Sequence, residues 1–524
     1  MKQLRELFKE NKFLVGVELV NSRGIIQQVN SQKTLKLASE LSEDNRIDWL
    51  SITDSAGGNP TMSPDFLAKQ IMKNGKNTII HLSCKDLNRN GLESLAWKYS
   101  SEGFDNLLII TGDYPINGYE GIAQPVFDID SVGLLKMLNE MNAGLKVKGR
   151  KPNSIAELDR TNFFLGCAVS PFKFSEAEQI MQYEKLKFKV KTGADFIISQ
   201  LGYDIRKSHE LLCYMKENNI SIPAIGYVYL LSAGVANIFN KDLIPGCMVN
   251  DDFLKKINEE KKSKDKGKGF FIDFAAKQFV ALKAMGYNGV YIGGIHKYED
   301  FTAIMKKVDE YKNANWLDFV AELSNPQANE FYYYSLDKNT GLSDVKNIIP
   351  EYLNFKKSSF SKHVSLSYKF SRLWHSLFFA YDAPFFNLCK SYYKFLEKRQ
   401  GKTLDKLSYF KERFWKSLFF KCKECGDCSL PDISYLCPVS QCEKNQRNGP
   451  CGGSSKDKCE ATKSGKDCIW VRAYYRNKYF NGNDNNLLNR RPVINNNDLK
   501  NTSSWANCFL LKDHNAYKGK ADTK

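Results

Sequence analysis

Two apolar runs decide the fold: Thr78-Ile-Ile-His-Leu-Ser-Cys84 and, after one helical segment, Asn106-Leu-Leu-Ile-Ile-Thr111. Both runs are short and rich in isoleucine and leucine. Residues 91–102, which lie between them, carry apolar side chains every three or four positions. A strand, an amphipathic helix and a second strand in this order are typical of a parallel β-α-β unit.

The same alternation extends from residue 13 to about residue 295. Eight strands are predicted, at residues 13–20, 49–53, 78–84, 106–111, 163–169, 195–200, 223–230 and 289–295. Residues 131–141 and 175–192 have the helical period. Eight such units predict an α/β fold, a (β/α)8 TIM barrel. A doubly wound open sheet is the alternative, but the GxGxxG pattern that favours it does not follow the first strand.

Chemistry in a TIM barrel is located at the C-terminal ends of the strands, so the polar residues there are candidates for the site. They are Glu18, Thr53, His81, Asp113 and Gln200. Glu18 lies between Val17 and Leu19. Burial among apolar neighbours raises the pKa of a carboxyl group, so Glu18 is predicted to be a general acid.

The positive charge of the 524-residue chain is concentrated near its C-terminus. Residues 1–350 carry 44 Lys and Arg against 43 Asp and Glu, whereas residues 351–524 carry 32 against 16, out of a net charge of +17. Such a region attracts nucleic acid, a membrane surface or an acidic protein, or it is simply a solvated surface. Because there is no membrane-spanning apolar run and no secretory signal, we expect a cytoplasmic protein that binds no membrane.

Residues 316–420 are predicted to form a helical connector. Aromatic runs such as Phe331-Tyr-Tyr-Tyr334 occur in it, and the helical spacing of Leu, Phe and Trp over residues 404–420 predicts packing helices. No nucleic-acid-binding motif accompanies these runs, so no nucleic acid partner is expected.

Eight of the fourteen cysteines lie within 47 residues. Without a secretory signal, metal ligation is favoured over disulfides. Eight thiolates suffice for two four-ligand sites, and both tetrahedral zinc and a [4Fe-4S] cluster fit the spacing. The predicted ligands are Cys422, Cys425, Cys428, Cys437, Cys442, Cys451, Cys459 and Cys468.

The ordered segments His81-Leu-Ser-Cys-Lys-Asp86, Asn106-Leu-Leu-Ile-Ile-Thr-Gly-Asp113 and residues 189–200 resemble the methylenetetrahydrofolate reductase family over residues 10–310. Asn448-Gly-Pro-Cys-Gly-Gly453 and the neighbouring cysteines resemble a C-terminal module attached to some members. The expected domains are therefore the flavin-binding barrel at 1–315, the connector at 316–420, a small cysteine-rich metal-binding module at 421–476 and an extension at 477–524.

The resemblance implies flavin-dependent reduction of 5,10-methylenetetrahydrofolate to 5-methyltetrahydrofolate, or the reverse oxidation. It implies that Glu18 is the general acid, that Asp113 lies beside the flavin and the folate, and that Gln200 contacts the pterin. Thr53, His81, Gly112 and Lys189 would belong, with Asp113, to the flavin site. FAD is the expected cofactor, and FMN stays open because Thr111 and Phe188 stand where bacterial members carry arginine.

The expected partners are a folate and an electron donor, which is NAD(P)H or an acidic electron-carrier protein, and we expect a homo-oligomer. Two other functions stay open. One is a folate- or corrinoid-dependent methyltransferase, although no His/Cys ligand set is evident at the barrel mouth. The other is a non-catalytic electron-transfer or scaffold subunit.

Overall fold

The structure is a computed structural model that describes residues 2–10, 12–151, 154–244, 246–355, 357–358, 361–399, 402–462, 464–482 and 487–516. The chain divides into two compact units. Unit 1 comprises residues 1–352 together with 451–460, and unit 2 comprises residues 353–450 and 461–524.

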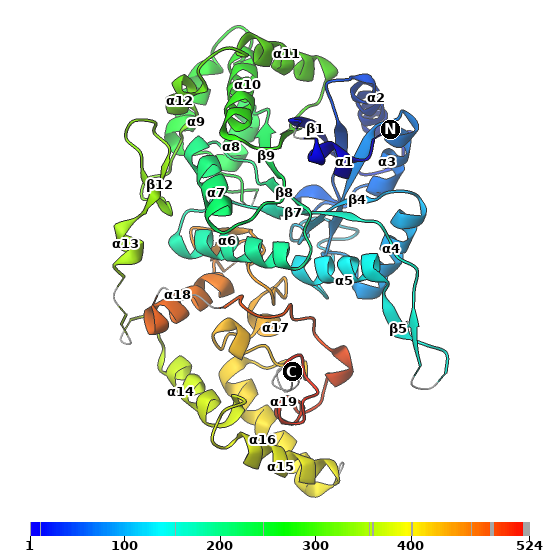
Figure 1. Ribbon diagram of the computed structural model, residues 1–524, viewed down its shortest axis with the longest axis vertical. Helices are drawn as coiled ribbons and strands as arrows, with labels where there is room; N and C mark the ends of the chain where they lie inside the picture. The colour runs from blue at the N-terminus through cyan, green and yellow to red at the C-terminus, as the bar shows by residue number, and fades with distance from the viewer. Residues whose placement is uncertain are drawn as a thin grey trace. The chain divides into compact units, whose positions relative to one another are not determined.

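Unit 1 is a closed barrel of eight parallel strands, in the spatial order β1-β10-β9-β8-β7-β4-β3-β2 (Figure 1). Each predicted strand is confirmed to within one or two residues at each end. The strands are β1 (Leu14–Leu19), β2 (Trp49–Ile52), β3 (Asn77–Ser83), β4 (Asn106–Ile110), β7 (Phe164–Val169), β8 (Phe196–Ser199), β9 (Ala224–Tyr229) and β10 (Gly289–Gly293).

Helices surround the strands, as a (β/α)8 barrel requires (Figure 1). They are α2 (Val29–Glu43), α3 (Pro64–Lys73), α4 (Arg89–Ser101), α5 (Ser131–Ala143), α6 (Glu176–Lys191), α7 (Ile205–Glu217), α8 (Ala233–Asn240), α9 (Asp251–Glu260), α10 (Lys268–Met285), α11 (Tyr298–Glu310) and α12 (Val320–Leu323). Local sequence signals explain where these helices begin. At α6, for example, the Ser175 hydroxyl accepts a hydrogen bond from the Glu178 amide, and the Glu178 carboxylate accepts one from the Ser175 amide.

The N-terminal end of the barrel is filled by apolar side chains. Helix α1 (Leu4–Lys9) places Leu4 and Phe8 in one buried cluster with Trp49, Phe164 and Phe196. The Phe8 ring lies 6.1 Å from that of Trp49 and 6.0 Å from that of Phe164, measured between ring centroids. Because this end of the barrel is packed, polar chemistry is left to the opposite end.

Unit 1 also contains three hairpins that the sequence pattern did not predict. One joins β5 (Lys146–Lys148) to β6 (Ile155–Glu157), a second joins β11 (Tyr334–Leu336) to β12 (Ser343–Ile348), and a third joins β13 (Ser454–Ser455) to β14 (Lys458–Cys459). The prediction of a helical connector over 316–420 is therefore wrong at residues 334–348, where an aromatic run enters a strand as the β-propensity of tyrosine favours. The boundary expected at residue 315 stays a prediction, although unit 1 continues to residue 352.

Unit 2 is mainly helical. Its helices are α14 (Leu366–Trp374), which continues into a π-helical turn at His375–Phe379, α15 (Phe386–Glu397), α16 (Thr403–Phe420), α17 (Pro438–Gln441), α18 (Ile469–Asn481) and α19 (Ser504–Phe509), and α13 (Pro350–Leu353) lies at the boundary of the units. Helix α15 packs on α19 through Phe386, Tyr393 and Phe509. Helix α18 crosses the expected start of the extension at residue 477, and residues 483–486 and 517–524 of that extension lie outside the described residues.

No described helix combines the length and the apolar character that crossing a bilayer requires.

Candidate active site

The predicted site residues lie at the C-terminal ends of the barrel strands. Glu18 is the fifth residue of β1, and His81 is in β3. Thr53 and Gln200 directly follow β2 and β8, and Asp113 follows β4 by three residues. Thr53 and His81 are buried, whereas the other three are partly exposed.

Two tyrosine hydroxyls hold the Glu18 carboxyl group. Tyr227 of β9 donates to Glu18 Oε2 at 2.6 Å, and Tyr291 of β10 donates to Glu18 Oε1 at 3.2 Å. Burial raises the pKa of Glu18, and the two hydroxyls oppose this rise only in part. A carboxyl group with a raised pKa is suited to donating a proton near neutral pH, as predicted for Glu18.

Gly293 provides the space for this pair. A Cβ atom at position 293 would lie 2.4 Å from the Tyr227 hydroxyl and 2.8 Å from Glu18 Oε2. Because real Cβ contacts do not approach so closely, any larger residue must push Glu18 and Tyr227 from their present positions.

His81 belongs to the same network, deeper in the barrel. Its Nε2 atom lies 2.8 Å from the Ser51 hydroxyl and 3.3 Å from the hydroxyl of Tyr291. Burial lowers the pKa of His81 to about 4, so the ring is neutral at pH 7. His81 therefore touches Glu18 only indirectly, through Tyr291.

Asp113 joins the loops that follow β2 and β4. Its Oδ2 atom accepts a hydrogen bond from the Gly57 amide at 2.7 Å, and the Ile116 amide donates to the Gly58 carbonyl at 3.2 Å. Gly112 has φ +87°, and a Cβ there would lie 3.0 Å from that of Ser83. The glycine before Asp113 is thus required by both backbone conformation and space.

Cys247 is buried, and burial raises the pKa of its thiol; the charges of Asp113 and Glu18 raise it further, whereas Lys173 lowers it. Gln200, at the C-terminal end of β8, lies close to the neighbouring residue Gly246: its Nε2 atom is 3.4 Å from the position that a Cβ of Gly246 would occupy.

The two lysines near β7 have different surroundings. Lys189 of α6 donates to the carbonyl of Ala168 at 2.6 Å, and burial lowers its pKa to about 8. Lys173, which was not predicted, is buried and donates to the carbonyls of Gly452 and, at 2.6 Å, Ser454. Residues 451–460 of the cysteine-rich region are thereby bound to the barrel within unit 1.

Three hydroxyl groups in the segments that follow the barrel strands have no protein partner among the described residues. They are Thr53 Oγ1, after β2, Ser170 Oγ, after β7, and Tyr203 Oη, after β8, and all three atoms are buried. Buried polar atoms are nearly always hydrogen-bonded, so each of these hydroxyls could meet a polar group of a ligand bound at this end of the barrel.

The comparison with known families decides the assignment. A sequence model described as methylenetetrahydrofolate reductase matches residues 3–309, which are 307 of the 524 residues. The chain belongs to the methylenetetrahydrofolate reductase family. A second model, described as methylene-tetrahydrofolate reductase C terminal, matches residues 402–496. The fusion expected from the sequence, a family barrel followed by the family's C-terminal module, is confirmed.

The similar solved structures are distant. One is an uncharacterized protein from Clostridium thermocellum, described as binding two copies of 5-methyl-5,6,7,8-tetrahydrofolic acid, with 13% identity and a TM-score of 0.42 over 59% of this chain and 99% of that chain. Another is 2,3-dimethylmalate lyase, with 9% identity and a TM-score of 0.32 over 59% of this chain and 85% of that chain. No curated protein matches in sequence. The methylenetetrahydrofolate reductase assignment rests on the family matches alone.

In the C-terminal module, four of the predicted ligands line one cavity of unit 2: Cys422, Cys425, Cys428 and Cys437. Lys416 and Arg447 line it too, and Lys416 Nζ lies 3.7 Å from Cys428 Sγ. Burial alone would lower the pKa of Lys416, but the negative charge of the thiolates and of Glu412 raises it above its usual value. The cavity thus carries the positive charge that a cluster of thiolates needs.

The sulfur atoms are spread more widely than ligands of one ion. Among the described residues, no three cysteine sulfurs lie within 4.8 Å of one another. A tetrahedral zinc site, with Zn–S bonds of about 2.3 Å, requires sulfur–sulfur distances of about 3.8 Å. The remaining predicted ligands divide between the units, with Cys442 and Cys468 in unit 2 and Cys451 and Cys459 in unit 1.

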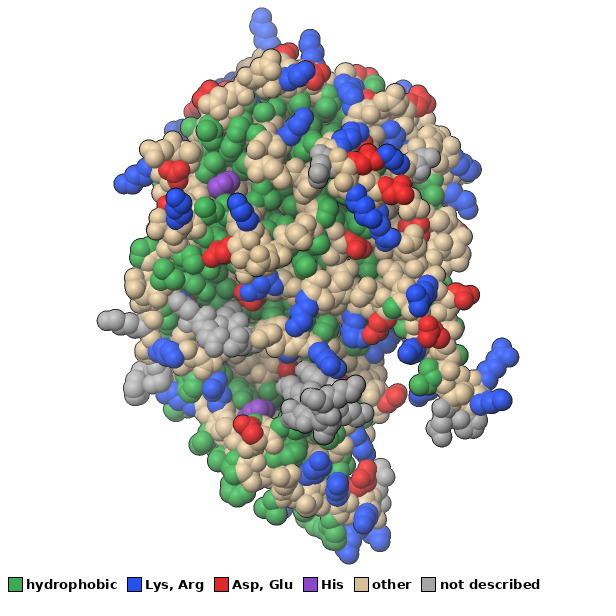
Figure 2. All heavy atoms as spheres, viewed as in Figure 1, with side chains coloured by type: hydrophobic (Ala, Val, Ile, Leu, Met, Phe, Trp, Pro, Cys, Tyr) green, Lys and Arg blue, Asp and Glu red, His purple; other side chains and the backbone are tan. Residues whose placement is uncertain are grey.

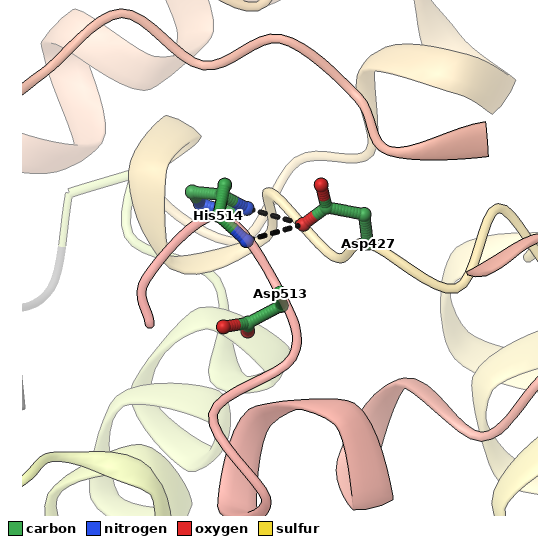
Figure 3. Close-up of side chains that lie close together, drawn as sticks. All are labelled: Asp427, Asp513 and His514. Atoms are coloured by element: carbon green, nitrogen blue, oxygen red, sulfur yellow. Dashed lines mark hydrogen bonds and ion pairs between the residues drawn. The ribbon is translucent and has the colours of Figure 1, made fainter. Parts of the chain in front are cut away.

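One carboxylate-histidine group in unit 2 has metal-like spacing: Asp427, Asp513 and His514 (Figure 3). His514 forms ion pairs with Asp427 through Nδ1 and with Asp432 through Nε2, the latter at 2.9 Å. Burial alone would lower the pKa of His514, but the two carboxylates raise it to about 9. Through its ion pair with Asp427, this group ties residue 514 to the loop between Cys425 and Cys428.

Proposed function

We propose that the chain is a flavin-dependent oxidoreductase that interconverts 5,10-methylenetetrahydrofolate and 5-methyltetrahydrofolate, with NAD(P)H or an acidic electron-carrier protein as the redox partner. The family assignment supports the folate substrate. The observation that carries the proposal is the Glu18 carboxyl group, which has a raised pKa and is held by two tyrosine hydroxyls at the barrel mouth.

In this proposal Glu18 stores the proton that opens the five-membered ring of the substrate to the reactive iminium. Tyr227 and Tyr291 fix the direction in which the carboxyl group points. Asp113 provides negative charge next to the folate, and Gln200 contacts the pterin through its amide.

A bound flavin, FAD or FMN, supplies the hydride transfer. We propose Thr53, His81, Gly112, Asp113 and Lys189 as its site. The buried and unpartnered Thr53 hydroxyl supports this assignment directly. His81 is supported less, because its Nε2 atom already contacts Ser51 and Tyr291.

The test separates the two half-reactions of Glu18→Gln. Reduction of the flavin by the donor should stay within about twofold of wild type, while reoxidation by 5,10-methylenetetrahydrofolate should slow at least about 100-fold, because only the folate step needs the proton. Equal loss of both half-reactions would assign Glu18 a structural role. A purified holoprotein without flavin absorption near ~450 nm would contradict the proposal as a whole.

We further propose that Cys422, Cys425, Cys428 and Cys437 hold a [4Fe-4S] cluster. The motif Cys422-x2-Cys425-x2-Cys428, followed by Cys437-Pro438, supports a cluster, and so does the one cavity that the four cysteines line. Lys416 and Arg447 would offset the negative charge of the cluster. Cys442, Cys451, Cys459 and Cys468 remain predicted metal ligands.

Metal analysis decides this second proposal. Iron and acid-labile sulfide should be present in the anaerobically purified protein, and Cys425→Ser should remove most of one cluster's iron. Cys389→Ser is the matched control, since this partly buried cysteine lies on α15 and does not line the cavity. Zinc without iron or sulfide would show that the site is a closed structural one.

A further inference from the structure

Helices α14, α15 and α16 each expose a stripe of apolar side chains. Helical spacing predicts that such stripes are buried, but in the described part of unit 2 these side chains are between 41% and 82% exposed. The members are Leu366, Phe370, Leu373 and Trp374 with α14, Phe385, Leu388, Tyr392 and Phe395 with α15, and Leu404, Leu407, Phe410, Phe414, Trp415, Leu418 and Phe419 on α16. We call this set the aromatic face.

Helix α16 buries charged side chains and exposes apolar ones, which is the reverse of an ordinary surface helix. Its buried residues are the charged Glu412 and Lys416, and Glu412 accepts a hydrogen bond from the Ser504 hydroxyl at 2.8 Å. Its phenylalanines and leucines point outward instead. Since the inward side is committed to a polar network beside the cysteine cavity, the apolar side is left exposed in the part of the chain that the structure describes.

The aromatic face is large. Nine of its members are aromatic and about half exposed, so together they present roughly 900 Å² of apolar side-chain surface over the three helices. Exposed apolar surface of a few hundred Å² or more marks an interaction site. Between α14 and α16 the surface also forms a groove of about 1150 Å³, lined by Phe370, Trp374, Trp415, Phe419 and Trp505.

The segment that carries the face has a strongly positive net charge. Residues 366–421 contain 12 Lys and Arg against four Asp and Glu, a net charge of +8. One of the four acids, Glu412, is buried against Lys416. Figure 2 shows hydrophobic side chains interspersed with Lys and Arg over this part of the molecule. Phe, Trp and Leu flanked by basic residues are the composition of helices that lie in a membrane interface.

We infer that the aromatic face docks this protein onto an anionic lipid surface, a role beyond the proposed reaction. A second copy of the chain fits less well, because a two-fold pairing would bring two surfaces of charge +8 together. A soluble electron carrier fits less well too, because such encounters bury little surface and depend on charge rather than on broad apolar contact. A bilayer accepts the phenylalanines and tryptophans without shape complementarity, while its phosphates meet the Lys and Arg side chains. This inference departs from the expectation that the chain binds no membrane.

Sedimentation of the full-length protein with large unilamellar vesicles tests the inference. Binding to vesicles with about 30% phosphatidylglycerol in phosphatidylcholine should be at least about tenfold tighter than binding to pure phosphatidylcholine. It should weaken as sodium chloride is raised from about 0.1 to 0.5 M, because salt screens the charge contribution.

Phe414→Glu should weaken vesicle binding at least about tenfold, because it places a carboxylate in the face. The matched control is Phe66→Glu, which changes an exposed phenylalanine of α3 in unit 1. Equal binding by the two variants, or no binding of wild type to anionic vesicles, would overturn the inference. Light scattering that shows a wild-type dimer, converted to monomer by Phe414→Glu but not by Phe66→Glu, would assign the face to self-association instead. Neither residue is near Glu18, so failure here leaves the proposed reaction standing.

Discussion

The two hydroxyls on Glu18 make the pH dependence of the folate step predictable. In Tyr227→Phe the ring is retained and one donor to the Glu18 carboxylate, at 2.6 Å, is lost. Since that bond favours the charged form, its removal should raise the pKa of Glu18 further above its ordinary value. A hydrogen bond to a charged group contributes about 1.5–3 kcal/mol, and about 1.4 kcal/mol corresponds to one pKa unit. The expected rise is therefore about one to two units.

The folate half-reaction needs the protonated acid, so its rate falls as the pH rises through the pKa of Glu18. Single-turnover oxidation of the reduced enzyme by 5,10-methylenetetrahydrofolate, measured from about pH 5 to 9, should show this fall moved to higher pH by one to two units in Tyr227→Phe. Tyr229→Phe is the matched control, because Tyr229 lies on the same strand and has no hydrogen bond to Glu18 among the described residues. An unchanged profile in Tyr227→Phe, or a shift to lower pH, would refute the assignment of Glu18 as the acid.

Three further changes test other parts of the structure. Gly293→Ala should lower the free energy of unfolding, measured by chemical denaturation, by about 1–3 kcal/mol and slow the folate step, because the added Cβ separates Glu18 from Tyr227. A variant with both the stability and the rate of wild type would contradict the close packing at Gly293. Lys173→Met should speed hydrogen exchange of the segment at 451–460 by at least about tenfold while the barrel strands stay protected, since two carbonyls lose their donor; an unchanged exchange rate would mean that Lys173 does not hold this segment. Cys428→Ser should lower the iron content and leave flavin content unchanged, as shown by metal analysis and absorbance; iron at the wild-type level would remove Cys428 from the ligand set.

The barrel was predictable because its signals are local. Each strand is a short run such as residues 106–111, bounded by residues that break strands, and each helix has its own period. The positions of Glu18, Thr53 and Asp113 follow from the rule that polar residues at the C-terminal strand ends meet at one mouth. The raised pKa of Glu18 was also predictable, because the neighbouring Val17 and Leu19 indicate that the carboxyl group is buried.

The partners of Glu18 were not predictable in the same way. Tyr227 and Tyr291 lie in strands far along the chain, and tyrosines in an apolar run are equally typical of an ordinary core. The small residues near them, Gly226 beside Tyr227 and Gly293 two positions after Tyr291, are a weak local signal. Lys173 was missed because its two acceptors, in residues 451–460, are 279 and 281 positions away in the sequence. Contacts between residues so far apart in the sequence depend on the complete fold, and the pattern of one segment does not predict them.

The stripe on α16 shows a different limit of periodicity. Leu404, Leu407, Phe414 and Leu418 recur as in a core-facing helix, and the pattern correctly predicts a helix there. Periodicity reports that one side is apolar, but not which side faces the protein. The side of α16 that faces the protein is decided by the buried ion pair of Glu412 and Lys416. Burial of this pair is stable only because each charge has the other and Ser504 as partners. Because the inner side of α16 holds this ion pair, its apolar side is free to contact an apolar environment outside the protein. The net charge of +8 over residues 366–421 indicates that this environment is anionic at its edge.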